Sequence, residues 1–454
     1  MPLAQIKLKN IEQVALSTRR QIGYAFGMLG WSIMINIIAV MLIYFYVPPN
    51  NSGMGQLIPQ VTVLGIFTLL SLIAASGRLL DAVTDPLLAY FSDRSHHPGG
   101  RRIPFMKVAV FPSVFFGMLI FFPLDYLESY RNVWWLAGMQ GAFYLSLTVY
   151  IIPYNALLPE LAESREAKIR LSAWLSLAFV LGIIISSQTP LLADIIQSNF
   201  GLLNRHTAFQ MAIGSLYLLS GLFMVIPIFS INESRDCTSR PASVNLGTAL
   251  KRILTHRNFL IFITADFSYF VALTIISSSM LYLVKVLLML EESVGGQVMG
   301  VMVGTSLLFY PLVIRLAVRL GKRRLVIWSL LALGALMLGV AFLGKIPLGP
   351  RVQIFGFALL AAVPTAFLGI LPFAIIADIS ERDGQETGQQ KEAMFFAVRN
   401  FSTKLGQTLG IMTFAILTLW GKDPFNDLGI RLASILGGLL CLIAGLVFTR
   451  FREE

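Results

Sequence analysis

The chain has 454 residues, of which 56% are hydrophobic and 13% are charged, and its formal net charge is +11. Charged residues make up about a quarter of an ordinary soluble domain, so this chain carries about half the usual share. A single core cannot bury this much apolar surface, which argues against a soluble enzyme, a disordered chain or a nucleic-acid-binding protein and indicates a polytopic membrane protein. The two cysteines, Cys237 and Cys441, exclude a disulfide framework, and no Cys/His metal spacing is present. We therefore expect no cofactor.

Twelve apolar segments are long enough to cross a bilayer as helices, which takes about 20 residues each. In chain order they are 22–47, 57–92, 104–124, 132–159, 170–195, 207–231, 258–288, 296–318, 323–344, 351–378, 392–419 and 429–449. The expected fold is an all-α membrane protein with 12 transmembrane helices.

The basic residues predict the orientation of these helices. Of the 35 lysines and arginines, 25 fall in the terminal tails and the loops on the same side, and 6 fall on the opposite side. Because such residues concentrate in cytoplasmic loops, we predict a plasma (inner) membrane protein with cytoplasmic N- and C-termini. The remaining four, Arg78, Lys285, Arg399 and Lys404, lie inside spans. The positive balance thus reflects topology and contact with anionic lipid, and we predict no nucleic-acid partner.

The polar stretch 232–257 divides the chain into an N-terminal half, 1–231, and a C-terminal half, 258–454, with six spans each. A weak internal repeat, a Pro-Leu pair followed by glycine and basic residues, ends the second and eighth spans at 86–102 and 311–324. Chance matching would explain the repeat alone. Together with the span count, it predicts the major facilitator fold, in which two pseudo-symmetric halves rock around a midplane site in alternating access.

The second span holds the densest set of charges inside the membrane. Arg78, Asp81 and Asp85 are spaced i, i+3 and i+7, so they share one helical face. Burying a charge at the bilayer centre costs at least about 2.5–3.5 kcal/mol, so such residues are candidates for function. Two carboxylates one turn apart can share a proton or bind a cation, and Arg78 can neutralise one of them. The alternative is a structural salt-bridge cluster at a helix end.

The eleventh span carries Lys404 about twelve residues from its start. A lysine this deep requires a carboxylate partner, and we expect the second span to supply it. We expect Arg399 to pair locally and Lys285 to snorkel at the outer end of its span. Asp266 either stabilises a helix start or lines the cavity.

Several motifs in both halves resemble those of the glycoside–pentoside–hexuronide:cation symporters, the melibiose-permease branch of the major facilitator superfamily. The matching motifs are RLLDAVTDP (78–86), SDR (92–94), GRRIP (100–104), IPYNALLPE (152–160), ADI (377–379), TG (387–388), FF (395–396) and NFSTKLG (400–406). The resemblance implies symport of a small solute, usually a sugar or glycoside, driven by H⁺, Na⁺ or Li⁺. It also implies a cation site with Asp81, Asp85 and Thr148, with Arg78 and Lys404 as charge partners.

The sugar-recognition residues of the melibiose permease are largely replaced here. Its acidic residue on the fourth span falls on Ile151 and its sugar-binding carboxylate on Ser32, and its stacking tryptophans fall on Asn155 and about Gly369. Melibiose is therefore not the expected substrate, and the coupling ion is either H⁺ or Na⁺. The same branch includes sodium-dependent lysophospholipid symporters, so an amphipathic substrate is an alternative.

Polar residues on the spans are candidates for lining the cavity. Asn36, Tyr150, Asn155 and Asn400 are predicted to bind substrate, because neutral oxygens and amides suit hydroxyl-rich solutes. The alternative for each is an interhelical hydrogen bond, which is common in membrane bundles.

Charges at the cytoplasmic helix ends form a candidate gate. Asp93, Arg101 and Arg102 follow the second span, and Glu160 and Asp378 are possible partners on other helix ends. Such ion pairs would close this side in the outward-open state. The alternative is that the basic residues only fix topology.

The sequence thus predicts a monomeric, cation-coupled secondary symporter of a small solute, most simply a sugar or glycoside. The alternatives are a sodium-dependent lysophospholipid transporter and an uncoupled exporter or facilitator. We do not expect an enzyme, because no phosphate-binding loop, nucleophile motif or metal cluster is present.

Overall fold

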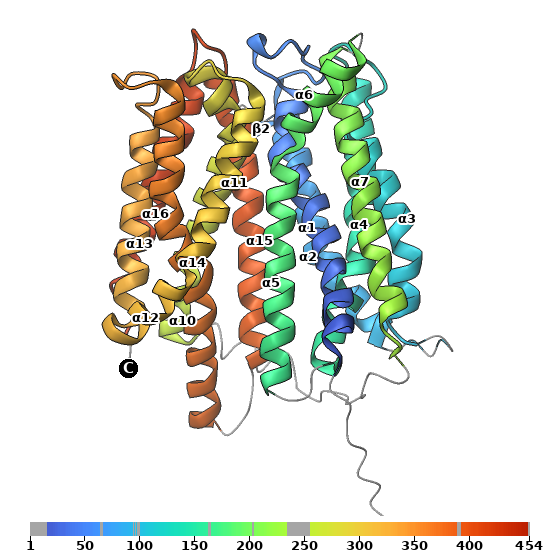
Figure 1. The fold of residues 1–454 in the computed structure, drawn as a ribbon, viewed down its shortest axis with the longest axis vertical. Coiled ribbons are helices and arrows are strands. Elements are labelled where there is room, and N and C mark those ends of the chain that lie inside the picture. The colour runs from blue at the N-terminus through green and yellow to red at the C-terminus, as the bar shows by residue number, and fades with distance from the viewer. Residues whose placement is uncertain are drawn as a thin grey trace, which may run out of the picture.

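The computed structural model describes residues 16–63, 67–93, 95, 97, 100–161, 165–201, 204–233, 255–387 and 392–452. Within these residues the chain is a bundle of long helices that run roughly side by side, with two short strands near one end (Figure 1). This is the all-α membrane fold that the sequence predicts.

The first group of helices comes from the N-terminal part of the chain. Its elements are α1 (Thr18–Tyr46), η1 (Asn50–Ser52), β1 (Thr62–Val63), β2 (Phe67–Thr68), α2 (Leu69–Asp93), α3 (Ile103–Ile120), α4 (Tyr130–Leu161), α5 (Arg165–Ser187), α6 (Thr189–Phe200) and α7 (Arg205–Ser230). In this group α1 packs against α5 and α7, α3 against α4 and α7, and α2 against α4.

The second group comes from the C-terminal part. Its elements are α10 (Arg257–Tyr282), the π-helix η2 (Leu283–Leu287), α11 (Glu292–Leu308), α12 (Tyr310–Leu320), α13 (Lys322–Val340), α14 (Pro350–Thr387), α15 (Glu392–Leu417), η3 (Thr418–Trp420) and α16 (Leu428–Phe448). Here α10 packs against α15 and α16, α13 against α14 and α16, and α11 against α14. The two groups meet where α2 packs on α15, α1 on α10, and α11 on α5 and α6.

Nine helices among the described residues are long and apolar enough to span a membrane, and α11 with α12 forms a tenth span, bent by 50°. Helices α2 and α15, which carry intramembrane charges, complete the twelve predicted spans. Three predicted boundaries were wrong, and one of them is the end of the tenth span, which continues past residue 378 to Thr387. The second span starts at Leu69, after the β1–β2 hairpin, because residues 59–68 include polar and β-branched residues that pair as short strands. The fifth span breaks at Gln188, before Pro190 in the first turn of α6.

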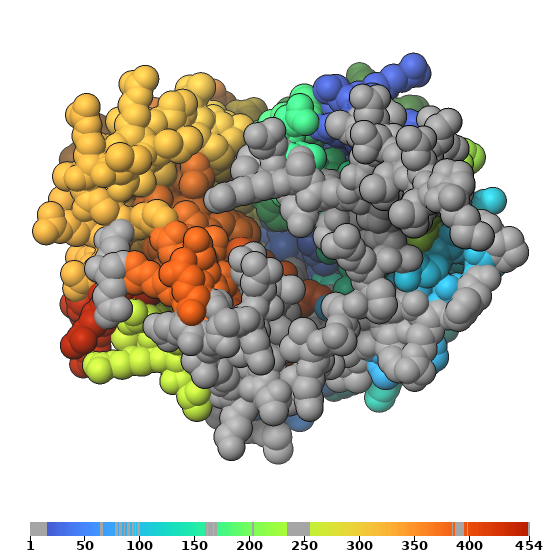
Figure 2. Space-filling model, turned by 90° about the horizontal axis from the view of Figure 1, so that it is seen from below, coloured from blue at the N-terminus to red at the C-terminus, as the bar shows by residue number. Residues whose placement is uncertain are grey.

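The two ends of the bundle are distinct. Helix α1 begins and α16 ends at the same end, which we call the terminal end, and the opposite end, where α1 leads into η1, we call the far end (Figure 1). Figure 2 views the terminal end, with the yellow, orange and red residues of the second group on the left and the blue and cyan residues of the first group on the right.

Tyrosines and glycines hold the helices of the first group close together. Tyr24 of α1 and Tyr154 of α4 each donate a hydroxyl hydrogen bond to the other's backbone carbonyl, and their rings stack at 4.4 Å. Gly30 lies so near α7 that an added Cβ would come within 2.5 Å of the Ser220 carbonyl oxygen. Such close approach of backbones is how membrane helices gain packing energy where water supplies no hydrophobic drive.

Candidate functional site

An ion pair joins the two groups of helices in the middle of the bundle. The Nζ of Lys404, on α15, donates to Oδ2 of Asp85, on α2. Lys404 lies about 18 Å along α15 from its start, and Asp85 about 12 Å before the end of α2, at 1.5 Å per residue. The second span therefore supplies the carboxylate partner that the depth of Lys404 predicts.

The surroundings of this pair leave it partly accessible. The Lys404 and Asp85 side chains are 27% and 23% exposed. Oδ1 of Asp85 is buried and accepts no hydrogen bond from the described residues. A buried carboxylate oxygen without a donor can receive a proton or a cation. The side chains of Arg78 and Asp81 lie outside the described residues.

Close contacts set the register between α2 and α4. The Gln140 Nε2 donates to the Ile73 carbonyl at 2.9 Å, and Gly77 packs on the Tyr144 ring, where a Cβ would come within 2.4 Å. Both pairs are separated by 67 residues, so the same register one turn further places Thr148 level with residue 81 of α2. Thr148 is buried, at 2% exposed. The structure therefore places it beside the helix that carries the predicted cation site.

Helix α15 is fixed to α10 by a second ion pair. Arg399 donates from Nε and Nη2 to the two carboxylate oxygens of Asp266 at 3.0 and 3.1 Å, and the side chains are 4% and 3% exposed. The Arg399 guanidinium also lies 4.2 Å from the centre of the Phe373 ring on α14. The prediction that Arg399 pairs locally was wrong, since its partner lies on another helix. The Asp266 side chain is buried where α10 packs on α15, and Arg399 is its partner there.

The predicted substrate residues differ in their exposure. Asn155 and Asn400 are exposed side chains on α4 and α15. Asn36 is half-buried on α1 and donates to the Ser32 carbonyl at 2.8 Å. Tyr150 is fully buried, and its hydroxyl donates to the Met224 carbonyl at 2.9 Å, so it packs α4 on α7 and faces no cavity in this conformation.

At the terminal end, the backbone amides of Arg101 and Arg102 and the carboxylate of Asp378 contact partners within their own groups. The backbone amides of Arg101 and Arg102 donate to the buried carboxylate of Glu233, which thereby caps α3. Asp378 of α14 pairs with Lys322 of α13 at 2.5 Å. The side chains of Asp93 and Glu160 lie outside the described residues. Sequence reasoning missed Glu233, whose only signal was a carboxylate near a helix end.

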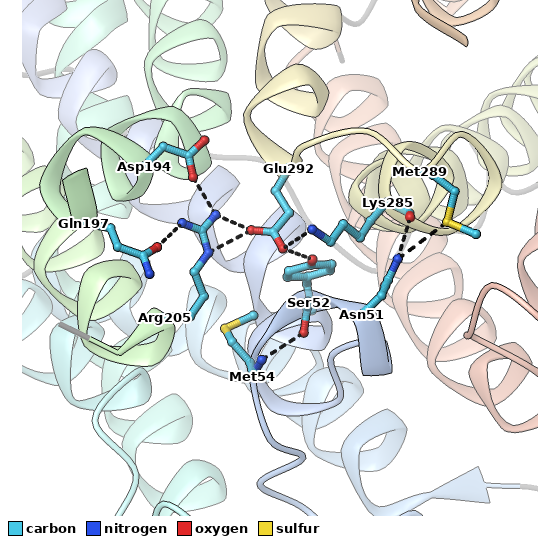
Figure 3. A network of polar contacts seen from close by, with 10 residues as sticks. Asn51, Ser52, Met54, Asp194, Gln197, Arg205, Lys285, Met289 and Glu292 are labelled. Atoms are coloured by element: carbon cyan, nitrogen blue, oxygen red, sulfur yellow. Dashed lines mark hydrogen bonds and ion pairs between the residues drawn. The ribbon is translucent and has the colours of Figure 1, made fainter. Parts of the chain in front are cut away.

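A polar cluster at the far end was also missed (Figure 3). It consists of Tyr44, Arg205, Lys285 and Glu292, and we call it the far-end cluster. Arg205 Nε donates to Glu292 Oε2 at 3.1 Å, and the Tyr44 hydroxyl donates to Oε1 at 2.7 Å. Lys285, predicted to snorkel, lies 3.7 Å from Glu292 Oε1. The available signal was a carboxylate, Glu292, in the first turn of an otherwise apolar span.

The comparisons with known proteins agree with this architecture. The model of the family described as MFS/sugar transport protein matches residues 23–451. The chain belongs to this family. It is therefore a secondary symporter of the major facilitator superfamily, embedded in a membrane, and not an enzyme.

Among its relatives in this family, the uncharacterized symporter YnaJ of Bacillus subtilis (strain 168) is 21% identical over 98% of this chain and 93% of its own length. The sodium-dependent lysophosphatidylcholine symporter 1 of Gallus gallus is 22% identical over 76% of this chain and 71% of its own. A solved D-xylose-proton symporter superposes with a TM-score of 0.63 at 16% identity, covering 96% of each chain. This last likeness shows the fold alone.

Coupling-ion chemistry in this transporter would rest on few carboxylates. The described residues include no group of three or more His, Cys, Asp or Glu side chains that could hold a metal ion. A Na⁺ ion at Asp85 would take several further oxygen ligands, whereas a proton would need only the carboxylate itself.

Proposed function

We propose that this MFS/sugar transporter is a symporter that couples entry of H⁺ or Na⁺ to uptake of a small solute. The observation that carries the proposal is the Asp85–Lys404 ion pair, which joins α2 to α15 between the two groups of helices. A charge pair at such an interface contributes to the energy difference between two arrangements of the groups. Whatever neutralises Asp85 therefore changes which arrangement is favoured.

The coupling step follows from the charges of the pair. In the empty carrier, Lys404 neutralises Asp85. A proton or Na⁺ at the carboxylates of Asp81 and Asp85, with Thr148 as a neutral ligand, removes the charge that holds Lys404. The released Lys404, with Arg78, rearranges, and the cavity between α2 and α15 becomes competent for substrate. The loaded carrier then rocks so that the cavity opens on the other side.

We propose a sugar or glycoside as the substrate. Asn36, Asn155 and Asn400 present amides, which suit hydroxyl groups, and Asn155 and Asn400 are exposed. The description of the family, MFS/sugar transport protein, supports the same class. Tyr150 would take part only if α4 and α7 separate during the cycle.

The same proposal fixes orientation and gating. The terminal end faces the cytoplasm of a plasma (inner) membrane, since 25 of the 35 basic residues lie in segments predicted on that side. The six-helix halves 1–231 and 258–454 are the moving units, joined by 232–257, and the carrier works as a monomer. Asp93, Arg101, Arg102, Glu160 and Asp378 would re-pair across the halves when the cytoplasmic side closes.

The test is uptake into proteoliposomes with imposed pH and Na⁺ gradients, against labelled sugars and glycosides. Asp85→Asn should abolish accumulation above equilibrium while leaving the protein folded. Asp125→Asn is the matched control, because Asp125 pairs with the exposed Arg131 at the surface of the far end. Unchanged accumulation by Asp85→Asn would refute the coupling role. Cation-independent exchange that survives the loss of both the Asp81 and the Asp85 carboxylates would indicate an uncoupled exporter or facilitator.

A second candidate substrate is a lysophospholipid. The relative in Gallus gallus is named a sodium-dependent lysophosphatidylcholine symporter. The positions that match the sugar carboxylate and a stacking tryptophan of the melibiose permease hold Ser32 and Asn155 instead. Labelled lysophosphatidylcholine belongs in the same uptake panel. Its accumulation on a Na⁺ gradient, without any sugar response, would favour this candidate.

A further inference from the structure

We propose that Glu292 is the latch that holds the far end of this transporter shut and that its release opens the cavity to that side. The inference rests on the alternating-access part of the proposed function, and it concerns residues to which neither substrate nor coupling ion has been assigned.

Glu292 contacts both groups of helices at the far end. Glu292 begins α11 in the second group, whereas its partners Arg205 and Tyr44 belong to α7 and α1 in the first. Its side chain is 1% exposed, and Arg205 is 13% exposed. The far end cannot open without parting this carboxylate from the guanidinium and the phenol.

Arg205 and Glu292 each have a second charged partner within their own group. Arg205 also pairs with Asp194 at 2.6 Å and bonds Gln197 at 2.8 Å, both on α6 (Figure 3). When Glu292 leaves, Arg205 therefore keeps partners in its own group. Glu292 keeps Lys285 in its own group, 3.7 Å away. Each half thus retains a compensated charge after separation, so the contact can break and form again without leaving a buried ion alone.

The backbone next to the far-end cluster has an unusual conformation. Lys285 lies in the π-helix η2, and Met289 has a φ of 54°, an unusual value for a residue other than glycine. The Asn51 Nδ2, from η1 of the first group, donates to the Lys285 carbonyl at 2.9 Å. π-Turns and left-handed residues gather at switching sites, where surrounding contacts hold them in place. Here one of the contacts that hold them, the Asn51 hydrogen bond, comes from the opposite group.

Solvent access differs between the two sides of the far-end cluster. A pocket of about 430 Å³ lies over the cluster and is lined by Ser52, Asp194, Gln197, Arg205, Lys285 and Glu292, with Ser198 and Glu291. Beneath the cluster, Ser278 of α10 is 1% exposed and donates to the Ala39 carbonyl of α1 at 3.1 Å. The cluster therefore separates a polar basin at the far end from the interface between α1 and α10. Water reaches one side of the latch and is excluded from the other.

The test measures opening directly, without substrate. A reporter, Ser278→Cys, is introduced where Cys237 and Cys441 have been replaced by alanine, and it is labelled with a membrane-impermeant maleimide applied from the far end. Glu292→Gln should increase the labelling rate about tenfold, because loss of the carboxylate charge shifts the population toward the open far end. Tyr44→Phe, which removes one hydrogen bond, should give a smaller increase in the same direction.

Controls separate a latch from a damaged fold. Asp125→Asn removes an ion pair at the same end but within the first group, and it should leave labelling unchanged. Arg205→Gln combined with Glu292→Gln should label no faster than the faster single variant, because both changes break one contact. Each variant is first checked for an unaltered gel-filtration profile and melting temperature.

The overturning results are distinct from those for coupled uptake. Equal protection of the reporter in wild type and in folded Glu292→Gln and Tyr44→Phe variants would overturn the latch. If the Glu292→Gln variant labels faster but the wild type shows no ion-driven uptake, the latch proposal stands and the coupling proposal fails.

Discussion

Helix α15 carries two basic side chains, five residues apart, in opposite environments. Arg399 binds Asp266 within its own group through two hydrogen bonds, and both side chains are almost fully buried. Lys404 reaches across the interface to Asp85, and both of these side chains are about one-quarter exposed. The same helix therefore holds one contact inside a group and one contact between groups.

The difference in burial gives the two pairs different uses. Removing one partner of a buried ion pair costs about 3–5 kcal/mol, because the other charge is left without water. Breaking a pair that is about one-quarter exposed loses less stability, since water partly replaces the lost partner. The Arg399 pair is thus suited to fixing α15 on α10, and the Lys404 pair to exchanging partners during transport.

The largest expected effect is on transport through the exposed pair. Lys404→Gln should abolish ion-driven accumulation, because neutralising Asp85 would no longer release a charge. It should lower the free energy of unfolding by less than loss of the Asp266–Arg399 pair does, because water partly reaches Asp85. Uptake in proteoliposomes and the melting temperature in detergent measure the two effects. If Lys404→Gln lowers the melting temperature as much as loss of the Arg399 pair does, the two pairs do not differ in their contribution to stability.

The next effect is on stability through the buried pair. Asp266→Asn should lower the free energy of unfolding by about 3–5 kcal/mol, since the Arg399 guanidinium would lose its counter-charge. Thermal unfolding in detergent checks this, with Asp85→Asn as the matched carboxylate control.

The double variant Asp266→Leu/Arg399→Met sharpens the same point. Replacing both charges by apolar groups of similar size should recover most of the lost stability. If the double variant is less stable than Asp266→Asn, the Asp266–Arg399 pair itself stabilises the fold, beyond each charge neutralising the other.

A smaller effect is expected at Thr148. Thr148→Ala should raise the ion concentration for half-maximal uptake by about three- to tenfold, equivalent to one lost oxygen ligand of about 0.5–1.5 kcal/mol. Thr148→Ser retains the hydroxyl and is the control. Equal curves for the alanine variant and wild type would remove Thr148 from the cation site.

The smallest effect is a pH dependence at the far end, outside the spans. Burial lowers the pKa of Lys422, and Asp423 opposes this shift. The unfolded chain then binds more protons between the lowered pKa and the ordinary value of 10.5, so stability rises with pH across that window. Wild type should gain stability relative to Lys422→Met as pH rises from about 7 to 10. A pH-independent difference in melting temperature would contradict it.

Periodicity, hydropathy and charge predicted the elements well, because they are local properties of the chain. Spans such as 22–47 and 429–449 match α1 and α16 to within a few residues. The bend at Phe309 comes two residues before Pro311, and the break at Gln188 comes two residues before Pro190. The mean hydropathy of a whole span does not reveal either interruption. Composition therefore predicts that a segment crosses the membrane but not where it bends.

The choice of partners was predicted only in part. Depth alone required a carboxylate for Lys404, and the second span offered Asp81 and Asp85, so the pairing of α15 with α2 was accessible from sequence. Arg399 offered no such restriction, and its partner Asp266 lies 133 residues away. Two residues this far apart meet only because α10 and α15 pack side by side.

The sequence by itself determined a twelve-span membrane protein with its charges concentrated on α2 and α15, because the bilayer requires long apolar helices and makes each buried charge costly. Tertiary structure alone decided which charges are static and which can be exchanged. It buried Arg399 between three helices, left Lys404 partly exposed at the interface, and brought Glu292 to Arg205 across the far end. Burial depends on what packs against a residue, and the neighbours come from parts of the chain that no local pattern connects.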